Sequence, residues 1–342
     1  MPEISILIPV YNNAEYLSEC LDSLLNQTYQ DFEIICVNDC SPDNSLEVLE
    51  HYHQKDSRIK IINKERNGGL STARNEGLAH AQGKYIYFCD GDDWLDNNYL
   101  EKMHDAAVQT NADVVLNTNI LTHNGVDEPF QHEIRYTQNY ISNVFLKPED
   151  CILRIIWNVW AYFWKKSFLD AVGARFCDGC KIDDMYFQST VLPFTQKIYV
   201  IRDCTYHYRI RKNSITSNAN INNSIYDICI ECYEKIFEFY QNRNMAERIN
   251  FKLFTSNIIP LFQHPDKQKL LAKIKQYFMS VQEIVQRTRN LYESDELEFF
   301  DCVIRDKWID FYKHLFSSQF SAKLRNNVVK NIQREVKHEG NI

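Results

Sequence analysis

Short apolar runs alternate with helix-like segments over the first 115 residues, and this alternation restricts the fold more than any other feature of the chain. The expected strands span residues 4–10, 32–37, 59–62, 84–89 and 112–116, and the expected helices span residues 17–25, 45–53, 70–81 and 97–109. Asn12 and Glu15 have the spacing of a capping pair for the first helix. A chain that enters a new strand after each helix forms parallel strands with right-handed crossovers. We therefore predict an α/β domain with a mostly parallel central sheet and flanking helices.

Polar residues follow several of these strands at the point where the strand ends. Tyr11 and Asn12 follow the first strand, Asp39 follows the second, and Asp90 and Asp92 follow the fourth. Because parallel strands present their carboxyl ends along one edge of a sheet, we expect these side chains to share one cleft. Five of the nine glycines lie between the third expected strand and Asp92, where they let the main chain approach a ligand closely.

The acidic turn, defined here as residues 90–93, places three carboxylates around Gly91 at the end of an apolar run. Carboxylates on a short turn suit a hard divalent cation such as Mg²⁺ or Mn²⁺. The same composition is typical of a solvated turn that caps the next helix, and we expect Asp93 to fill that structural role. The turn alone leaves both interpretations open.

Length and charge exclude some classes of protein. A chain of 342 residues suggests about two domains. A net charge of −8 argues against a dedicated nucleic-acid binder, which normally presents a basic surface. The first residues lack the basic region of a signal peptide, and the most apolar later stretch, residues 152–164, is interrupted by Arg154 and Asn158. We therefore expect a cytoplasmic protein.

Eleven cysteines exclude a complete intramolecular disulfide framework, because the count is odd. Cys177 with Cys180 and Cys229 with Cys232 form two pairs of the CxxC type. A zinc site built from both pairs is an alternative, although their separation fits no common zinc-binding pattern.

The pattern becomes helical after residue 217, and we place the domain boundary there. Residues 1–217 are expected to form the α/β domain, and residues 218–342 a helical C-terminal region. Within this region, residues 323–337 combine five cationic side chains with apolar ones at helical spacing. Such a segment suits docking on an anionic membrane surface, and an ordinary packed helix is the alternative. Acceptor binding and homo-oligomer formation are further roles open to this region.

Four segments resemble, in order, the motifs of the family-2 glycosyltransferases, which have the GT-A fold. These segments are residues 4–12, 37–45, 67–75 and the acidic turn, and the resemblance covers about residues 3–216. It implies an inverting transfer of a sugar from a nucleotide diphosphate donor, expected here to be a UDP-sugar, with Mn²⁺ or Mg²⁺. It also implies an acceptor hydroxyl on a cell-surface polysaccharide or a lipid-linked glycan.

The resemblance assigns roles to individual residues. The donor-binding residues are Pro9, Tyr11, Asp39, Arg74, Asp90, Gly91, Arg211 and Ser214, and the metal ligands are Asp92 and Asp90. Tyr11 offers a flat face for a base, and Arg74 adds charge to a glycine-led helix start that favours an anion. The alternative for Tyr11 is an aromatic residue packed at a surface rim, and the alternative for Arg74 is a surface arginine. Asn38 and Cys40 depart from the family, which often has a second acid and a glycine there.

Inversion by single displacement needs one general base and no protein nucleophile. Residues 181–187 resemble the family segment that supplies the base, with Asp184 as the base and Asp183 where glutamate is more usual. Two adjacent carboxylates resist double ionisation, which raises one pKa toward a useful range. Capping of the helix that begins there is the alternative role for this pair.

Residues 206–216 resemble the loop that closes over the diphosphate in the family. Arg209, Arg211 and Lys212 concentrate positive charge in this segment, which suits binding of a diphosphate. The alternative is that these charges only form a solvated surface. His207 offers a metal ligand, but a structural histidine is the simpler interpretation.

Two other functions make different demands on the sequence. A sugar nucleotidylyltransferase should carry a glycine-rich turn with an arginine after the first strand, where this chain has Tyr-Asn-Asn-Ala-Glu. A non-catalytic binding module should have lost the metal acid or the base, whereas Asp92 and Asp184 are both present.

Overall fold

The computed structural model describes residues 1–123, 127–129, 142–146, 158–211 and 225–243, together with isolated positions between 272 and 305. The chain divides into two compact units. The first consists of Met1–Asn222 with Glu231–Phe239, and the second of Asn223–Ile230 with Tyr240–Ile342. The basic segment 323–337 lies outside the described residues.

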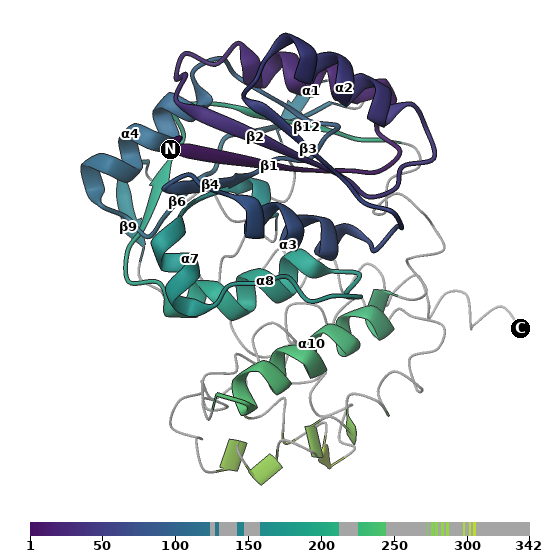
Figure 1. The fold of residues 1–342 in the computed structure, drawn as a ribbon. Helices are drawn as coiled ribbons and strands as arrows, with labels where there is room; N and C mark the ends of the chain where they lie inside the picture. Colours follow the sequence, from purple (N-terminus) through teal and green to yellow (C-terminus); the bar gives the residue numbers. More distant parts are fainter. Residues whose placement is uncertain are drawn as a thin grey trace, which may run out of the picture. The chain divides into compact units, whose positions relative to one another are not determined.

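The first unit is built around a sheet whose described strands number eight, in the order β3-β2-β1-β4-β10-β6-β11-β9 (Figure 1). The strands are β1 (Ile4–Val10), β2 (Phe32–Asn38), β3 (Ile59–Asn63), β4 (Tyr85–Phe88), β6 (Val114–Asn117), β9 (Val144–Leu146), β10 (Tyr162–Lys165) and β11 (Ile198–Ile201). Neighbours β3, β2, β1 and β4 pair in parallel, as do β6 and β11. The mostly parallel sheet that the sequence predicts is confirmed.

One central strand runs against the others and was not predicted. β10 lies antiparallel between β4 and β6, although it follows them in the chain. Tyr162, Phe163 and Trp164 are all buried, and the strand lies directly between the 3-10 helix Val159–Ala161 and the helix Lys166–Val172, so no turn residue marks its ends in the sequence. β9 is also antiparallel, against β11 at the edge of the sheet.

Helices cover both faces of this sheet. Their bounds are α1 (Ala14–Leu25), α2 (Ser45–Lys55), α3 (Leu70–His80), α4 (Tyr99–Thr110), α7 (Lys166–Val172) and α8 (Asp183–Val191). In Figure 1, α1 and α2 lie on one side of the sheet, and α3 and α8 lie on the other. α10 (Ile225–Gln241) follows the α/β part of the chain.

The predicted capping pair at the start of α1 is wrong. Asn13 occupies the N-cap position without a side-chain cap, and Asn12 has a left-handed φ of 56°. The Asn12 N–H instead donates to Ser41 Oγ at 2.8 Å, so the chain after β1 is fastened to the chain after β2. A non-glycine residue in this conformation needs such local support.

A second sheet holds a later segment against the acidic turn. Its order is β5-β12-β7-β8, with β5 (Trp94–Leu95), β12 (Tyr206–Arg209), β7 (Ile120–His123) and β8 (Asp127–Pro129). β5 starts immediately after the acidic turn and pairs antiparallel with β12. This pairing brings residues more than a hundred positions apart into one place, which local sequence patterns do not predict.

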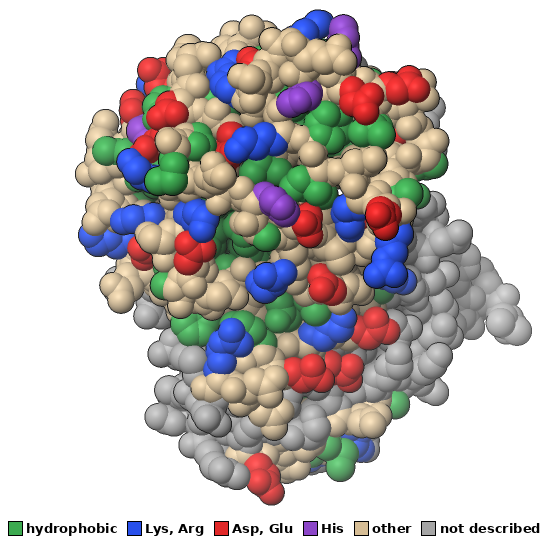
Figure 2. Space-filling model, viewed as in Figure 1, with side chains coloured by type: hydrophobic (Ala, Val, Ile, Leu, Met, Phe, Trp, Pro, Cys, Tyr) green, Lys and Arg blue, Asp and Glu red, His purple; other side chains and the backbone are tan. Residues whose placement is uncertain are grey.

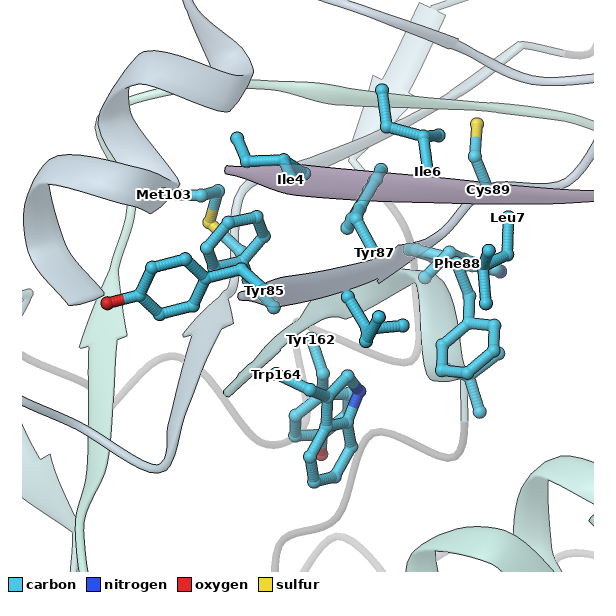
Figure 3. Close-up of a cluster of buried hydrophobic side chains, with 14 of the residues drawn as sticks. Ile4, Ile6, Leu7, Tyr85, Tyr87, Phe88, Cys89, Met103, Tyr162 and Trp164 are labelled. Carbon is cyan, nitrogen blue, oxygen red and sulfur yellow. The ribbon is translucent and has the colours of Figure 1, made fainter. Parts of the chain in front are cut away.

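Aromatic rings dominate the core beside β4 and β10. Tyr85 and Tyr87 of β4 pack against Phe163 of β10, whereas Tyr162 and Trp164 pack against each other on the opposite face of the sheet (Figure 3). Trp160, in a short 3-10 helix at Val159–Ala161, stacks on Tyr206 with ring centroids 4.1 Å apart and an interplanar angle of 4°. Within the described residues, no helix has the length and apolar character needed to span a bilayer.

Replacing Trp160 with Ala should separate the second sheet from the first by removing the ring that supports Tyr206. Trp160 is 2% exposed, so we expect the free energy of unfolding to fall by about 3–5 kcal/mol, as for other buried aromatic truncations. Urea denaturation followed by tryptophan fluorescence measures the change. Val108→Ala, at a residue 53% exposed, is the control and should leave the midpoint nearly unchanged.

Candidate active site

The acidic turn follows β4 directly at the carboxyl edge of the sheet. The Asp93 N–H donates to the Asp90 carbonyl at 3.2 Å and closes the turn. A Cβ atom added to Gly91 would lie 2.8 Å from Asn13 Nδ2, so a larger residue would displace the Asn13 side chain. Glycine at this position therefore leaves room for Asn13 beside the turn.

Asp90 and Asp92 are placed near enough for each charge to affect the other. Burial, followed by the charge of Asp90, raises the pKa of Asp92 to about 6, while Arg211 acts in the opposite direction. Arg211 Nε lies 2.6 Å from Asp92 Oδ2, and Arg74 Nη2 lies 2.9 Å from Asp90 Oδ1. The Asp92 side chain is 13% exposed, so the alternative of a solvated turn is wrong.

Arg74 is the electrostatic centre of the site. It is 2% exposed, which makes the alternative of a surface arginine wrong. Its guanidinium contacts Asp90, lies 3.0 Å from Asp183 Oδ2, and forms a third ion pair with Asp184 Oδ1. Burial acts to lower the pKa of Arg74, but the charges of Asp184, Asp183 and Asp90 raise it. The side chain therefore stays charged and connects α3 to the acidic turn and to α8.

Asp184 lies in the first turn of α8 with its carboxyl group held from two sides. Besides Arg74, the Val159 N–H donates to Asp184 Oδ2 at 3.3 Å. Burial raises the pKa of Asp184 to about 7; Arg74 opposes this shift, and the charge of Asp183 adds to it. Burial is thus a larger cause of the raised pKa than the adjacent Asp183, the cause expected from the sequence. A carboxyl group with this pKa is suited to accept a proton near neutral pH.

The capping role considered for the Asp183–Asp184 pair is not observed. Ile182 holds the N-cap position, and no side chain caps α8. Asp183 Oδ1 accepts the Asp184 N–H at 3.1 Å, while its other oxygen binds Arg74.

Asp93 fastens β12 to the acidic turn. Its Oδ2 accepts the Tyr206 hydroxyl at 2.5 Å, and its Oδ1 accepts the Arg209 N–H at 2.8 Å. Burial and the two acidic neighbours raise the pKa of Asp93 well above its usual range. The next helix begins only at Tyr99, so the predicted helix cap is wrong although the role is structural.

Asp39 is buried at the end of β2 and orders the chain before α3. Its carboxylate accepts the N–H groups of Gly68 and Gly69, the latter at 2.7 Å, and pairs with Lys64. Gly69 has φ 86° and ψ 169°, a conformation essentially restricted to glycine. Two N–H groups that we expected to face a phosphate are therefore bonded to Asp39, and the predicted contact of Asp39 with the donor stays a prediction.

Pro9 and Tyr11 lie beside this region. Pro9 is buried in β1 beyond the last pair with β4, at Leu7 and Phe88, so its missing N–H interrupts no pairing between those strands. Tyr11 is 49% exposed at the end of β1, which leaves a face of the ring open. Cys40 has φ 56°, which explains why glycine suits this position in the family. The donor contacts assigned to Pro9 and Tyr11 stay predictions.

Two arginines at the end of β12 and just after it contact the acidic turn. Arg209 Nε donates to the Asp92 carbonyl at 2.9 Å, and Arg209 Nη2 pairs with Glu19 at 2.5 Å. Arg211 Nη1 donates to Asn13 Oδ1 at 3.2 Å in addition to binding Asp92. Arg209 is thus a structural residue, and Arg211 lies at the site. Lys212 and Ser214 lie outside the described residues.

His207 has the contacts of a structural histidine. Its Nε2 lies 2.9 Å from Asp96 Oδ1, its Nδ1 lies 3.0 Å from His123 Nε2, and its ring stacks on Trp94. Over the described residues, no cluster of three or more His, Cys, Asp or Glu side chains is arranged to hold a metal ion.

Two residues that the sequence argument did not single out complete the site. Asn13 contacts Arg211 and sets the space available to Gly91, and Lys64 neutralises Asp39 while donating to Thr72 Oγ1 at 2.7 Å. Only the place of Asn13 in the chain, directly after Tyr11 and Asn12 at the end of the first strand, indicated that it could belong to the site. Lys64 lies in a polar stretch without a distinguishing pattern.

The acidic turn fits a divalent cation that also binds a substrate. Asp90 and Asp92 would supply carboxylate oxygens, and a bound cation would relieve the effect of the Asp90 charge on Asp92. Mg²⁺ is commonly held by one or two carboxylates together with substrate phosphates and water, so a cage of protein ligands is not required.

The class of protein follows from this geometry and from sequence. The sequence pattern of the family described as glycosyl transferase family 2 matches residues 5–168. The chain is 34% identical over 228 residues to the uncharacterized glycosyltransferase EpsJ of Bacillus subtilis, covering 63% of each. It is 31% identical over 227 residues to glycosyltransferase GlyG of Streptococcus pneumoniae, covering 62% of this chain and 72% of GlyG. The chain belongs to glycosyl transferase family 2, as the motifs implied, and this family assignment sets the nucleotidylyltransferase alternative aside.

Further relatives extend this comparison. The minor teichoic acid biosynthesis protein GgaB of Bacillus subtilis is 28% identical over 283 residues, covering 79% of this chain and 29% of GgaB. The match therefore spans less than two thirds of EpsJ and GgaB. Residues 1–349 of Staphylococcus aureus TarS in complex with UDP-GlcNAc share the fold, with a TM-score of 0.69, 23% identity, and coverage of 91% of this chain and 89% of that 1–349 segment. A Pyrobaculum calidifontis mannosyltransferase in complex with GDP-Man and Mn²⁺ has a TM-score of 0.52 at 14% identity, covering 89% of this chain and 84% of that one. The expected GT-A fold is confirmed.

Replacing Arg74 with Met should strongly destabilise the first unit, because three carboxylates would lose the buried cation between them. We expect the free energy of unfolding at pH 8 to fall by about 3–5 kcal/mol, as when one partner of a buried ion pair is removed. The deficit should shrink at pH 5, since protonation relieves the repulsion between the carboxylates.

Arg58→Met is the matched control for this change. Its pair with Asp56 is 24% exposed on both sides, so the loss should stay within about 1 kcal/mol at either pH. Urea unfolding at both pH values measures all three proteins. Equal effects of the two substitutions would contradict the central role given to Arg74.

Proposed function

We propose that this protein transfers a sugar from a UDP-sugar to a glycan hydroxyl with inversion, in one displacement, with the help of a divalent cation. The observation that supports it most directly is that Asp90 and Asp184 both contact the guanidinium of Arg74. The expected donor-binding turn and the expected base therefore flank one charged group. UDP as the leaving nucleotide is supported by the TarS complex, which contains UDP-GlcNAc.

In this proposal the acceptor oxygen attacks the anomeric carbon while the bond from that carbon to the diphosphate breaks. Asp184 accepts the hydroxyl proton as the new bond forms. Asp90 and Asp92 would hold a divalent cation, which would supply positive charge to the diphosphate as it departs. Arg211 is paired with Asp92, and its guanidinium would bind the phosphates after it leaves this carboxylate.

The acceptor and the location of the reaction are also proposals. A cell-surface polysaccharide or a lipid-linked glycan is supported by the similarity to GgaB, which is named for minor teichoic acid biosynthesis. Work at the inner face of the membrane would suit such an acceptor, with the basic segment 323–337 as the contact. The described face in Figure 2 mixes acidic and basic side chains and shows no extended basic patch.

Changing Asp92 to Asn should remove the cation-dependent part of UDP binding, because a neutral amide replaces one of two carboxylate ligands. Titration calorimetry with UDP, with and without Mn²⁺, measures the effect. We expect a loss of at least tenfold in affinity with Mn²⁺ and little change without it. Unchanged affinity with Mn²⁺ would contradict the metal assignment.

Changing Asp184 to Asn should leave UDP binding with Mn²⁺ intact and remove the transfer. Hydrolysis and transfer are measured after a screen of UDP-Glc, UDP-Gal, UDP-GlcNAc and UDP-GalNAc. In the unaltered enzyme, the base works only when it has lost its proton. With a pKa of about 7, the rate should therefore rise with pH through that value. Substantial transfer by the Asn variant would point to another base.

A further inference from the structure

Three cysteines and a lysine form a cluster that the proposed transfer does not use. Cys177 and Cys180 are the ends of a turn in which the Cys180 N–H donates to the Cys177 carbonyl at 3.0 Å. Gly179, inside the turn, has φ 73°. This geometry brings two side chains three positions apart onto one short loop. Both are partly exposed thiols, so small molecules in solution can reach them.

The third thiol comes from α10, in the segment that belongs to the first unit. Cys232 Sγ donates to the Ile182 carbonyl at 3.7 Å, two residues after Cys180. One helical turn later, Lys235 Nζ donates to the Asp178 carbonyl, inside the turn, at 3.4 Å. The lysine therefore places a positive charge over the turn, on the same helix face as Cys232.

These contacts distinguish the two thiols of the turn. The hydrogen bond from Cys232 is the largest cause that lowers the pKa of Cys180 to about 7, with further lowering by Lys235 and Cys177 and opposition from burial and Asp183. Burial and the charge of Cys180 raise the pKa of Cys177 to about 11. A thiolate is the nucleophilic form of cysteine, so Cys180 is the attacking group and Cys177 its neighbour.

We propose that Cys177 and Cys180 form a peroxide-reactive dithiol site, in which Cys180 reacts first and Cys177 then closes a disulfide across the turn. The Cys180 thiolate attacks one oxygen of a hydroperoxide, the O–O bond breaks, and hydroxide or alkoxide leaves with the electron pair. Cys177, after losing its proton, attacks the sulfur of the resulting sulfenic acid, and the S–O bond breaks to release hydroxide. Two thiols are oxidised to one disulfide, and with hydrogen peroxide two molecules of water are formed.

The experiment uses the full-length protein and needs no glycosyl transfer, so its outcome is independent of the proposed function. Alkylation by iodoacetamide is followed by peptide mass spectrometry as a function of pH. The reaction of Cys180 should be half-maximal near pH 7, against about 8.5 for an ordinary thiol. Lys235→Met should move this midpoint to higher pH, whereas Lys102→Met, at an exposed lysine of α4, should not.

Treatment with hydrogen peroxide tests the second step. Disulfide mapping should find Cys177 joined to Cys180 before the exposed Cys40 has lost its thiol. In Cys177→Ser this disulfide should be absent, and dimedone should label Cys180 as the sulfenic acid. Circular dichroism verifies that each variant is folded. A midpoint at or above pH 8.5, a Cys180–Cys232 disulfide in place of Cys177–Cys180, or oxidation of Cys40 first would overturn the proposal.

Discussion

The contact of one buried guanidinium with three carboxylates is the interaction on which the site depends. Arg74 has almost no access to water, so its charge is stable there only because Asp90, Asp183 and Asp184 surround it. The reverse also holds, because three acids this close need a cation. Arg74 lies on α3, Asp90 follows β4, and the other two acids begin α8. Electrostatics therefore fixes the spacing between three elements that the sheet alone leaves independent.

The other acids at this edge of the sheet divide by the partners that they already have. Asp39 is bonded to Lys64 and two glycine N–H groups, and Asp93 is bonded to Tyr206 and Arg209. Both hold loops in place. Asp92 is paired with Arg211, whose side chain is 25% exposed and is therefore less enclosed than the partners of Asp39 and Asp93. A cluster of carboxylates that looks uniform in sequence thus contains loop anchors and groups suited to a ligand.

Helical spacing predicted α1 and α2, and short apolar runs separated from the helices predicted β1, β2 and β4, which are buried along their whole length. Tyr162 to Trp164 are equally buried, but β10 was missed because it lies directly between a 3-10 helix and α7, with no turn residue to mark its ends. Sequence periodicity also missed the burial of Arg74 and the partners of Asp93, since these contacts join residues about a hundred positions apart. The motif order located the acidic turn and the Asp183–Asp184 pair. Nothing local indicated that a single arginine connects them.

The position of β10 has a consequence for synthesis. A nascent chain that has reached residue 117 already contains β1, β2, β3, β4 and β6, but β10 must be made before β6 can join β4. Until then the sheet ends at β4, whose residues Tyr85 to Phe88 present an apolar, unpaired edge. The sheet therefore stays incomplete until about fifty more residues have been synthesised. During this time the unpaired edge of β4 makes the partly folded domain prone to aggregation.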